Sequence, residues 1–254
     1  MAATSTGVAV LLAGGLAAVH AVAGRLRFLT SIPRSQYLSL AGSVSVAYVF
    51  AHLLPEVTAR QAELAAAAES PLPGVFAGEQ ALFTVALAGF AVFYALEQLA
   101  ARSRRRSGPG AVAGGATTPT SERVFWLHIG SFAVYNVLVG YFLFHREATG
   151  TVALLLYFVA MALHFVVNDH GLRERHRAAY SRIGRWVLVA SIGCGALVGV
   201  LVAVSTTVLG LLLAFLAGGV ILNVIKEELP EERESSVPAF AVGLVGYTAI
   251  LLSV

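Results

Sequence analysis

The stretch HLLPE, at residues 52–56, closes a long apolar run, and EELPE, at residues 227–231, closes another near the far end of the chain. The segments that follow them also share a weak pattern, ALAGFAVFYAL at 86–96 and AFAVGLVGYTA at 239–249, in which Gly89 stands against Gly243. A Pro and an acid close to a helix end are also ordinary helix-terminus chemistry. The recurrence therefore indicates a repeat only if the organisation of the chain agrees with it.

The composition predicts a membrane protein. Of 254 residues, 57% are hydrophobic and 12% are charged, and the mean hydropathy of +0.79 is too high for a water-soluble domain of this size. A bilayer crossing needs about 17 to 25 apolar residues. Runs of this length predict eight transmembrane helices, at 6–24, 37–55, 80–101, 124–144, 151–169, 186–204, 207–226 and 237–253. We therefore expect an all-α polytopic fold in one transmembrane domain, 1–254.

The basic residues predict the orientation of these helices. With eight spans and both termini outside, all but two of the 17 basic residues fall in the inner loops or at their edges, and only Arg60 and Arg146 fall outside. This bias follows the rule that positive charge stays on the cytoplasmic side. We expect an integral protein of the plasma (inner) membrane, with anionic lipid contacting the Arg-rich inner loops.

A polar segment, RSRRRSGPGAVAGGATTPTSER at 102–123, separates three helices (6–101) from five (124–253). Its Gly, Pro and Ser content predicts a flexible cytoplasmic linker. In the predicted topology HLLPE ends an outward helix and EELPE ends an inward one. Helices 1–3 and 6–8 are thus predicted to form an inverted repeat around helices 4 and 5.

The two middle helices carry an unusual number of polar residues. The fourth contains His128, Ser131, Tyr135 and Asn136, and the fifth contains His164, Asn168, Asp169 and His170. Polar groups at membrane depth are costly and usually face the bundle interior or a wet cavity. His128, Ser131 and Tyr135 form one helical stripe, and His164 and Asn168 share a face at i and i+4. These helices are therefore predicted to hold any transport pathway.

The 3+5 organisation, HLLPE, GEQALFTVALAGFAVFYALEQL at 78–99 and AGGVILNVIKEELPEE at 217–232 together resemble the ZIP family of divalent-metal transporters. The resemblance covers nearly the whole chain. It implies an eight-helix transporter that moves zinc, iron or manganese as its substrate toward the cytoplasm, through a site on the fourth and fifth helices. It implies no organic cofactor and no enzymatic activity.

The sequence departs from the family at that site. The family's fourth helix reads His-Ser-x-x-Glu/Asp-Gly-x-x-x-Gly, but SFAVYNVLVG places Ser131 and Tyr135 where His and an acid are expected, if Gly140 matches the last glycine. The fifth helix keeps His164 but has Asn168 in place of the acid and Asp169 in place of the glycine. First-row dications prefer imidazole and carboxylate ligands. A remodelled metal site is therefore predicted from His164, Asn168 and Asp169, joined by His128.

Several other polar residues are candidates for the two mouths of the pathway. His52 and Glu56, at i and i+4, are predicted to collect cations at the outer mouth or to mark the water boundary. Glu227 and Glu228 are predicted to pass a cation onward at the inner mouth or to solvate the helix end.

Five further residues are not expected to be ligands. His20 and His145 are predicted to lie at the membrane interface, and Cys194 lies among small residues that favour close helix packing. His170 and His176 lie in a basic cytoplasmic run that is predicted to contact anionic lipid.

Three functions stay open at this stage. The first is ZIP-like transport of a divalent cation, and the second is a related scaffold or sensor that does not transport. The third is an intramembrane metal-dependent hydrolase with His128, His164 and Asp169 as zinc ligands, although the sequence lacks a close His-x-x-x-His pair. The expected partners are the cation and the bilayer, without nucleic acid, and a homodimer is left open as the oligomeric state.

Overall fold

The computed structural model describes residues 2–23, 34–66, 80–107, 119–145, 150–228 and 236–253, and these form helices without strands. The all-helical class is thus confirmed. The elements, two of which are short π-helices (η2 and η5), are α1 (Ala2–Val22), α3 (Arg34–Tyr48), η2 (Val49–Leu53), α4 (Leu54–Ala66), α5 (Ala81–Ser107), α6 (Pro119–Phe142), α7 (Thr151–Ala179), η5 (Tyr180–Gly184), α8 (Arg185–Leu201), α9 (Thr206–Glu228) and α10 (Val237–Leu252).

Within the described ranges, five helical stretches are long and apolar enough to cross a membrane. They are Gln36–Leu64, Ala81–Leu99, Glu122–Phe142, Thr151–Leu201 and Thr206–Lys226. The fourth is 51 residues long and contains the predicted span 151–169 and most of the predicted span 186–204, which ends earlier than predicted, at Leu201. The helices Thr6–Val22 and Val237–Leu252 are apolar but shorter. These properties fit an integral membrane protein, as the composition predicts.

The HLLPE stretch lies where the helix changes from the π-helix η2 to the α-helix α4. In η2 the N–H of Leu54 donates to the carbonyl of Val49, five residues back, in place of the usual four. Pro55 follows immediately, and its ring removes one N–H donor from the ladder and crowds the preceding turn. A wider π-turn relieves this crowding. The chain then continues as α4 to Ala66, so the helix extends beyond the apolar run.

Both ends of the expected linker are helical. α5 continues through the Arg-rich segment to Ser107, because arginine is a good helix former, and α6 begins at Pro119, a residue favoured in the first helical turn. Residues 108–118 of the linker lie outside the described ranges.

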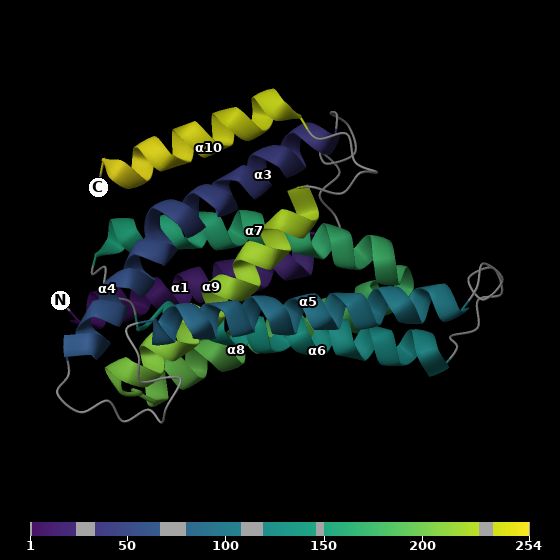
Figure 1. Ribbon diagram of the computed structural model, residues 1–254, viewed down its shortest axis with the longest axis horizontal. Coiled ribbons are helices and arrows are strands. Elements are labelled where there is room, and N and C mark those ends of the chain that lie inside the picture. Colours follow the sequence, from purple (N-terminus) through teal and green to yellow (C-terminus); the bar gives the residue numbers. More distant parts are fainter. Residues whose placement is uncertain are drawn as a thin grey trace.

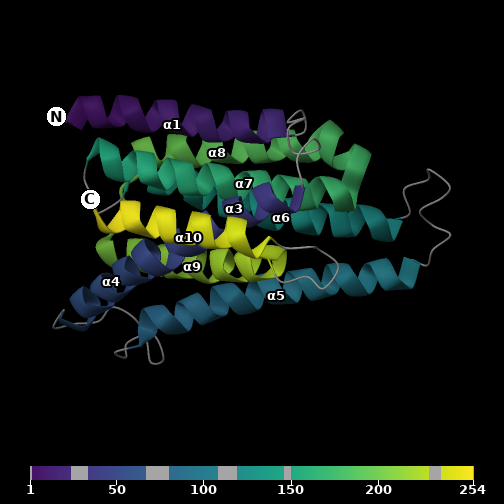
Figure 2. The same ribbon diagram turned by 90° about the horizontal axis from the view of Figure 1, so that it is seen from above.

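The 51-residue stretch is not one straight rod. Arg177 has φ 37° and ψ −108° inside the helical run, a conformation that L-residues rarely adopt. The chain turns there, and α8 runs back along the bundle from the end that α7 reaches (Figures 1 and 2). α7 thus extends past the predicted end at residue 169, because His170, Leu172 and their neighbours are buried in the fold.

The helices associate in two sets. The first, called here the α1 set, contains α1, α6, α7 and α8, with α8 packed on both α1 and α6. The second, called the α9 set, contains α3, α4, α5, α9 and α10, with α5 packed on α9 and α3 packed on α10. The sets meet along a seam where α7 lies on α3 and α6 lies on α5. Figure 2 shows α1 and α5 at opposite edges of the bundle.

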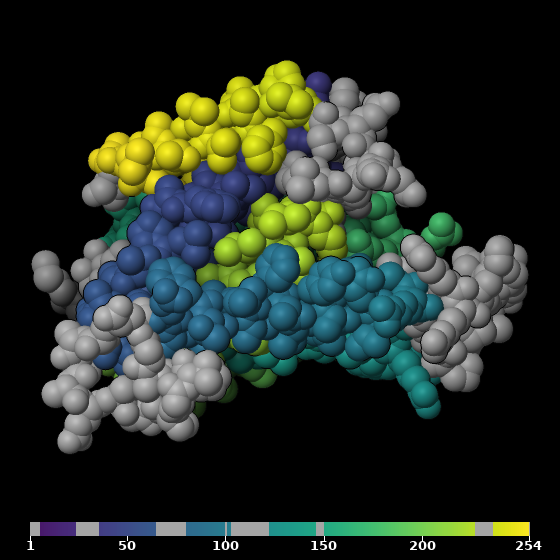
Figure 3. Space-filling model, in the orientation of Figure 1, coloured from purple at the N-terminus to yellow at the C-terminus, as the bar shows by residue number. Residues whose placement is uncertain are grey.

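Glycines permit the closest helix contacts within each set. A Cβ on Gly195 would collide with the carbonyl of Val137 on α6, and a Cβ on Gly218 would collide with the carbonyl of Ala86 on α5. Small residues that let two backbones approach are typical of helix pairs in membranes. In the space-filling view α5 covers one long face, with part of α9 visible between α5 and α3 (Figure 3).

Two further glycines contact helix positions that correspond to each other in the predicted repeat. A Cβ on Gly89 of α5 would collide with the carbonyl of Phe215 on α9, and a Cβ on Gly243 of α10 would meet Ser43 and the carbonyl of Leu40 on α3. Leu40 stands as far before Pro55 as Phe215 stands before Pro230. Each of the two helices that precede an LPE stretch thus packs against a glycine of a neighbouring helix, at the same sequence distance before the proline.

Candidate functional site

The structure divides the four predicted metal ligands among three places. His164 and Asn168 contact each other, Asp169 contacts His20, and His128 lies with Glu97 and His176. Among the residues with described side chains, no three His, Cys, Asp or Glu side chains converge as a ready-made metal site. The His128, His164 and Asp169 set required for the hydrolase hypothesis is likewise spread over these separate clusters.

His164 and Asn168 lie on one face of α7, as their spacing predicts. The Asn168 amide lies 2.8 Å from His164 Nε2, so the amide nitrogen donates to the ring. The ring of Tyr135 on α6 lies 5.6 Å from that of His164, and all three side chains are buried. The Tyr135 hydroxyl points to the sulfur of Met161 at 4.0 Å. This cluster offers one imidazole and no carboxylate.

Asp169 points away from His164 and toward the first helix. Its two carboxylate oxygens lie 2.8 and 3.0 Å from His20 Nδ1. The other nitrogen of that ring, Nε2, lies 3.1 Å from the amide nitrogen of Asn136 on α6. Phe165 stacks on the His20 ring with centroids 4.4 Å apart. His20, predicted to lie at the interface, is instead 1% exposed in a buried polar cluster.

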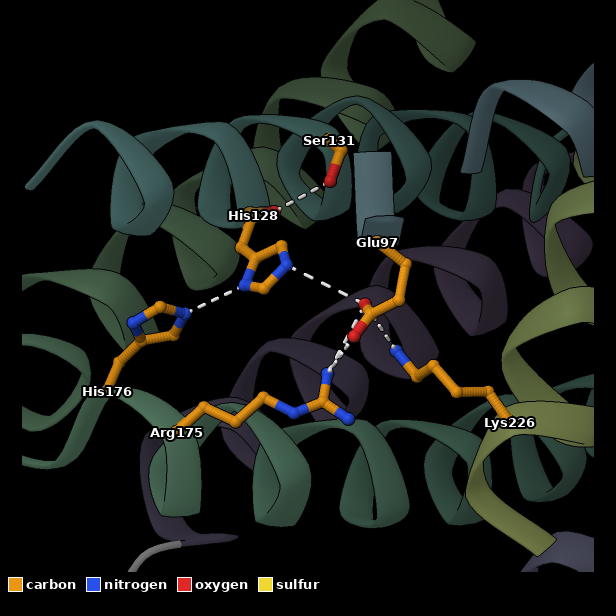
Figure 4. A network of polar contacts seen from close by, with 6 residues as sticks. All are labelled: Glu97, His128, Ser131, Arg175, His176 and Lys226. Carbon is orange, nitrogen blue, oxygen red and sulfur yellow. Dashed lines mark hydrogen bonds and ion pairs between the residues drawn. The ribbon is translucent and has the colours of Figure 1, made fainter. Parts of the chain in front are cut away.

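A second polar cluster is built around Glu97 at the end of the seam (Figure 4). Its carboxylate lies 3.1 Å from Lys226 Nζ on α9 and 3.1 Å from the Arg175 guanidinium on α7. These side chains are 17 to 25% exposed, so water screens their attraction only in part. Glu97 and Lys226 belong to the α9 set and Arg175 to the α1 set. The carboxylate thus joins the two sets.

His128 completes this cluster from α6. Its Nδ1 lies 2.8 Å from His176 Nε2, and its own Nε2 lies 3.6 Å from Glu97 (Figure 4). Ser131, one turn further along α6, donates its hydroxyl to the backbone carbonyl of His128 at 2.8 Å. The Ser131 hydroxyl is therefore used in a hydrogen bond within its own helix. It does not take the place of the histidine that the family pattern has at this position. Glu97, Arg175 and Lys226 together leave an excess of positive charge in the cluster.

The predicted outer pair forms at its expected spacing. His52 Nε2 and a Glu56 oxygen are 3.9 Å apart, and the other Glu56 oxygen lies 3.7 Å from Arg60. The His52 ring also lies 5.2 Å from that of Tyr48. Arg60 was not predicted as a partner, and its charge offsets the carboxylate that a cation would need. The side chains of Glu227 and Glu228, predicted at the inner mouth, lie outside the described part of the chain.

The remaining histidines have local partners. His145 stacks on Tyr141 and lies 2.8 Å from the carbonyl of Gly199. His170 lies 3.5 Å from Glu174, one turn later on α7. Cys194 is exposed on α8. The His145 contact joins α6 to α8, and the His170 contact lies along one face of α7.

Among the cluster participants that sequence reasoning missed are Glu97, Lys226 and His20. Glu97 and Lys226 are 129 residues apart, and His20 and Asp169 are 149 apart, so no local spacing links them. A signal did exist for each of them. Glu97 and Lys226 are ionisable residues near the ends of apolar runs, and His20 lies inside another, where a polar side chain needs a partner.

The chain matches no protein-family model and no curated protein. The relation to ZIP transporters is therefore a resemblance carried by the motifs of the sequence.

Proposed function

We propose that this protein is a ZIP-like carrier that moves a divalent cation, such as zinc, iron or manganese, across the plasma membrane toward the cytoplasm. The observation that carries the proposal is the seam, because its polar side chains include residues of α6 and α7, the predicted transport helices. His164 and Tyr135 lie in its buried middle, and His128 faces Glu97 where the sets meet at one end. Buried polar groups between two helix sets are typical of transport pathways.

The proposal includes eight spans arranged as three plus five, with helices 1–3 and 6–8 as an inverted repeat. Two observations support this arrangement. The matched contacts of Gly89 with Phe215 and of Gly243 with Leu40 relate α5 on α9 to α10 on α3. In addition, α1 begins and α10 ends at the same end of the bundle, as an even number of crossings requires (Figures 1 and 2). The proposed orientation places both termini outside and residues 102–123 in the cytoplasm.

In this proposal the Glu97 cluster is the closed inner gate. The cluster joins the two sets, and its excess positive charge opposes the passage of a cation. Separation of Arg175 from Glu97 would remove both obstacles at once. Alternating access then consists of movement of the α1 set against the α9 set, with the Glu97 contacts made in one state and broken in the other.

Uptake by cells tests the proposal. Cells that express the protein should accumulate zinc, iron or manganese faster than cells with an empty vector. His164→Ala and Asp169→Ala should each lower this uptake at equal surface abundance, while His145→Ala should not. Uptake that is unchanged in both variants would contradict the proposed pathway residues.

A second candidate is a related scaffold or sensor that binds partners without transport. The observation that favours it is the pairing of His164 with Asn168, because the amide supplies no charge to offset removal of the water shell of a dication. This candidate predicts no accumulation of any of the three metals above the vector control, even though the protein reaches the membrane folded.

A further inference from the structure

Positive charge gathers at the turn between α7 and α8. From Arg173 to Arg185, across this turn, the chain has five arginines and one glutamate. Glu97 contacts Arg175, and Glu174 lies 3.5 Å from His170. The other four arginines form no ion pair with any residue that the structure describes: Arg173, Arg177, Arg182 and Arg185. The turn therefore has an excess of positive charge that the described part of the chain does not neutralise.

Arg173 and Arg185 approach the same buried group, although one belongs to α7 and the other to α8. Both guanidinium groups act electrostatically on the hydroxyl of Tyr180, in η5, so they lie near it. Both arginine side chains are half-buried. Asp169 lies beside this hydroxyl, and its carboxylate also contacts His20. Two guanidinium groups thus share the neighbourhood of one buried carboxylate, and one positive charge stays unbalanced.

The guanidinium group of Arg185 is oriented by an aromatic ring and has an unused donor. Its central carbon lies 4.9 Å from the centre of the Trp186 ring, a cation–π contact that restricts its orientation. The Nε atom is buried and has no hydrogen-bond partner among the described residues. Buried polar atoms usually have a partner, so an orphan donor indicates one that the chain itself does not supply. The group that this donor needs is an acceptor oxygen.

Both tryptophans of the chain lie at this end of the bundle. Trp126 on α6 and Trp186 on α8 are 46% and 51% exposed. They lie at a similar level, because a Cβ on Gly184 would meet the Ile129 side chain at 2.9 Å, and this contact is two residues from Trp186 and three from Trp126. Tryptophan is enriched at the level of the lipid headgroups. The two rings therefore indicate that the arginines of the turn lie at headgroup level.

We propose that Arg173, Arg185 and Trp186 form a binding site for the phosphate group of an acidic phospholipid. Guanidinium groups bind phosphate oxygens through paired N–H donors, and they also stack on aromatic rings. Beside these arginines, Ile183 and Trp186 are 39% and 51% exposed. Exposed apolar side chains suit the acyl chains of a lipid, whereas a soluble phosphate gains nothing from them. The occupant that matches both the charge and the apolar surface is therefore a lipid.

This inference goes beyond the proposed function and uses only its orientation. In that orientation the turn faces the cytoplasm, where the adjacent leaflet is rich in acidic lipid. The inference narrows the expected contact of acidic lipid with the Arg-rich loops to one defined site. The site is separate from the seam, because Arg175 contacts Glu97 while Arg173 and Arg185 face Tyr180. Transport and lipid binding can therefore fail independently.

Fluorescence quenching in lipid nanodiscs tests the site. Trp126→Phe leaves Trp186 as the single tryptophan of the full chain. In discs of phosphatidylcholine, phosphatidylglycerol with brominated acyl chains should quench Trp186 at a mole fraction at least about tenfold lower than brominated phosphatidylcholine does, because each arginine near the surface favours acidic lipid by about fivefold. Equal quenching by the two brominated lipids would overturn the inference.

Three variants in the Trp126→Phe background distinguish a defined site from general attraction. Arg185→Gln should remove most of the preference for the acidic lipid. Arg185→Lys should keep only part of it, because lysine retains the charge but lacks the planar fork of N–H donors. Arg123→Gln, which removes an exposed arginine from α6, should leave most of the preference intact, since salt screens the attraction of an exposed charge. An equal loss in Arg185→Gln and Arg123→Gln contradicts a defined site.

Two further measurements complete the test. Gel filtration and helical circular dichroism show whether each variant folds, and if Arg185→Gln does not, Arg173→Gln tests the same site from α7. A folded Arg173→Gln protein should also lose preference for the acidic lipid, and an unchanged preference overturns the site. Excess inorganic phosphate at matched ionic strength should not displace the lipid. If it does, the site binds a soluble anion and the inference is wrong.

Discussion

At the scale of single residues, the two charged residue types that occur only once in the chain each contact a partner on a helix distant in sequence. The only lysine, Lys226, contacts Glu97, and the only aspartate, Asp169, contacts His20. Each contact joins helices that are far apart in sequence. Ionisable groups at membrane depth are expensive unless they are paired or serve a function. These pairs therefore each hold two helices of the bundle together.

Replacement of Glu97 tests how much the contacts of the proposed gate stabilise the protein. Glu97→Gln leaves Lys226 and Arg175 facing each other without a counter-charge, so we expect the free energy of unfolding to fall by about 2 to 3 kcal/mol. Glu122→Gln, at an exposed acid in α6, should change it by less than about 0.5 kcal/mol. The measurement is unfolding of the purified proteins in detergent.

The double variant Glu97→Gln with Lys226→Met supplies the decisive comparison. Removal of the orphaned cation should restore part of the lost stability, because the cost comes from the uncompensated charge. If the double variant is no more stable than Glu97→Gln, the pairing of Glu97 with Lys226 contributes little and the gate rests on Arg175 alone.

At the scale of elements, the hydropathy pattern could predict which segments form helices but not all of their ends. α7 continues beyond residue 169 because Leu172 and its neighbours are buried by contacts that no local pattern reveals. α5 continues to Ser107 through arginines that interrupt the apolar run but favour helix. The stretch around Pro55 could be predicted as a helix disturbance, although its π-turn could not.

The candidate site was harder to predict than the helices. The i, i+4 contact of His164 with Asn168 follows from helix geometry alone. Asp169 is the next residue on the helix and points about 100° away, toward α1. Its partner depends on which helix packs on that face, and this information is tertiary. Burial of most polar side chains of α6 and α7 could therefore be predicted from the sequence, but the partner that each side chain contacts could not.

The repeat makes a prediction about two helix contacts. Gly89→Val and Gly243→Val should each destabilise the protein by about 1 to 3 kcal/mol, because each added side chain must displace a neighbouring helix. Gly246→Val lies on the same helix as Gly243 in open space and should be nearly neutral. Thermal unfolding in detergent measures all three variants. A large effect in only one of the two repeat-related positions would contradict the equivalence of α5 on α9 and α10 on α3.

At the scale of the whole molecule, the two helix sets and the seam between them explain why buried polar groups lie where they do. The outer pair His52 and Glu56 belongs to the α9 set, the middle groups belong to α6 and α7, and the Glu97 cluster joins both sets.

The most direct test of this account is flux through the purified protein. Vesicles that contain the protein and an enclosed metal-sensitive dye should take up Zn²⁺, Mn²⁺ or Fe²⁺ faster than protein-free vesicles. The uptake should saturate with concentration, and Asp169→Asn should abolish it in protein that folds normally. Uptake no faster than in protein-free vesicles for all three ions, with correctly folded protein in the membrane, would contradict the account and favour a scaffold or sensor.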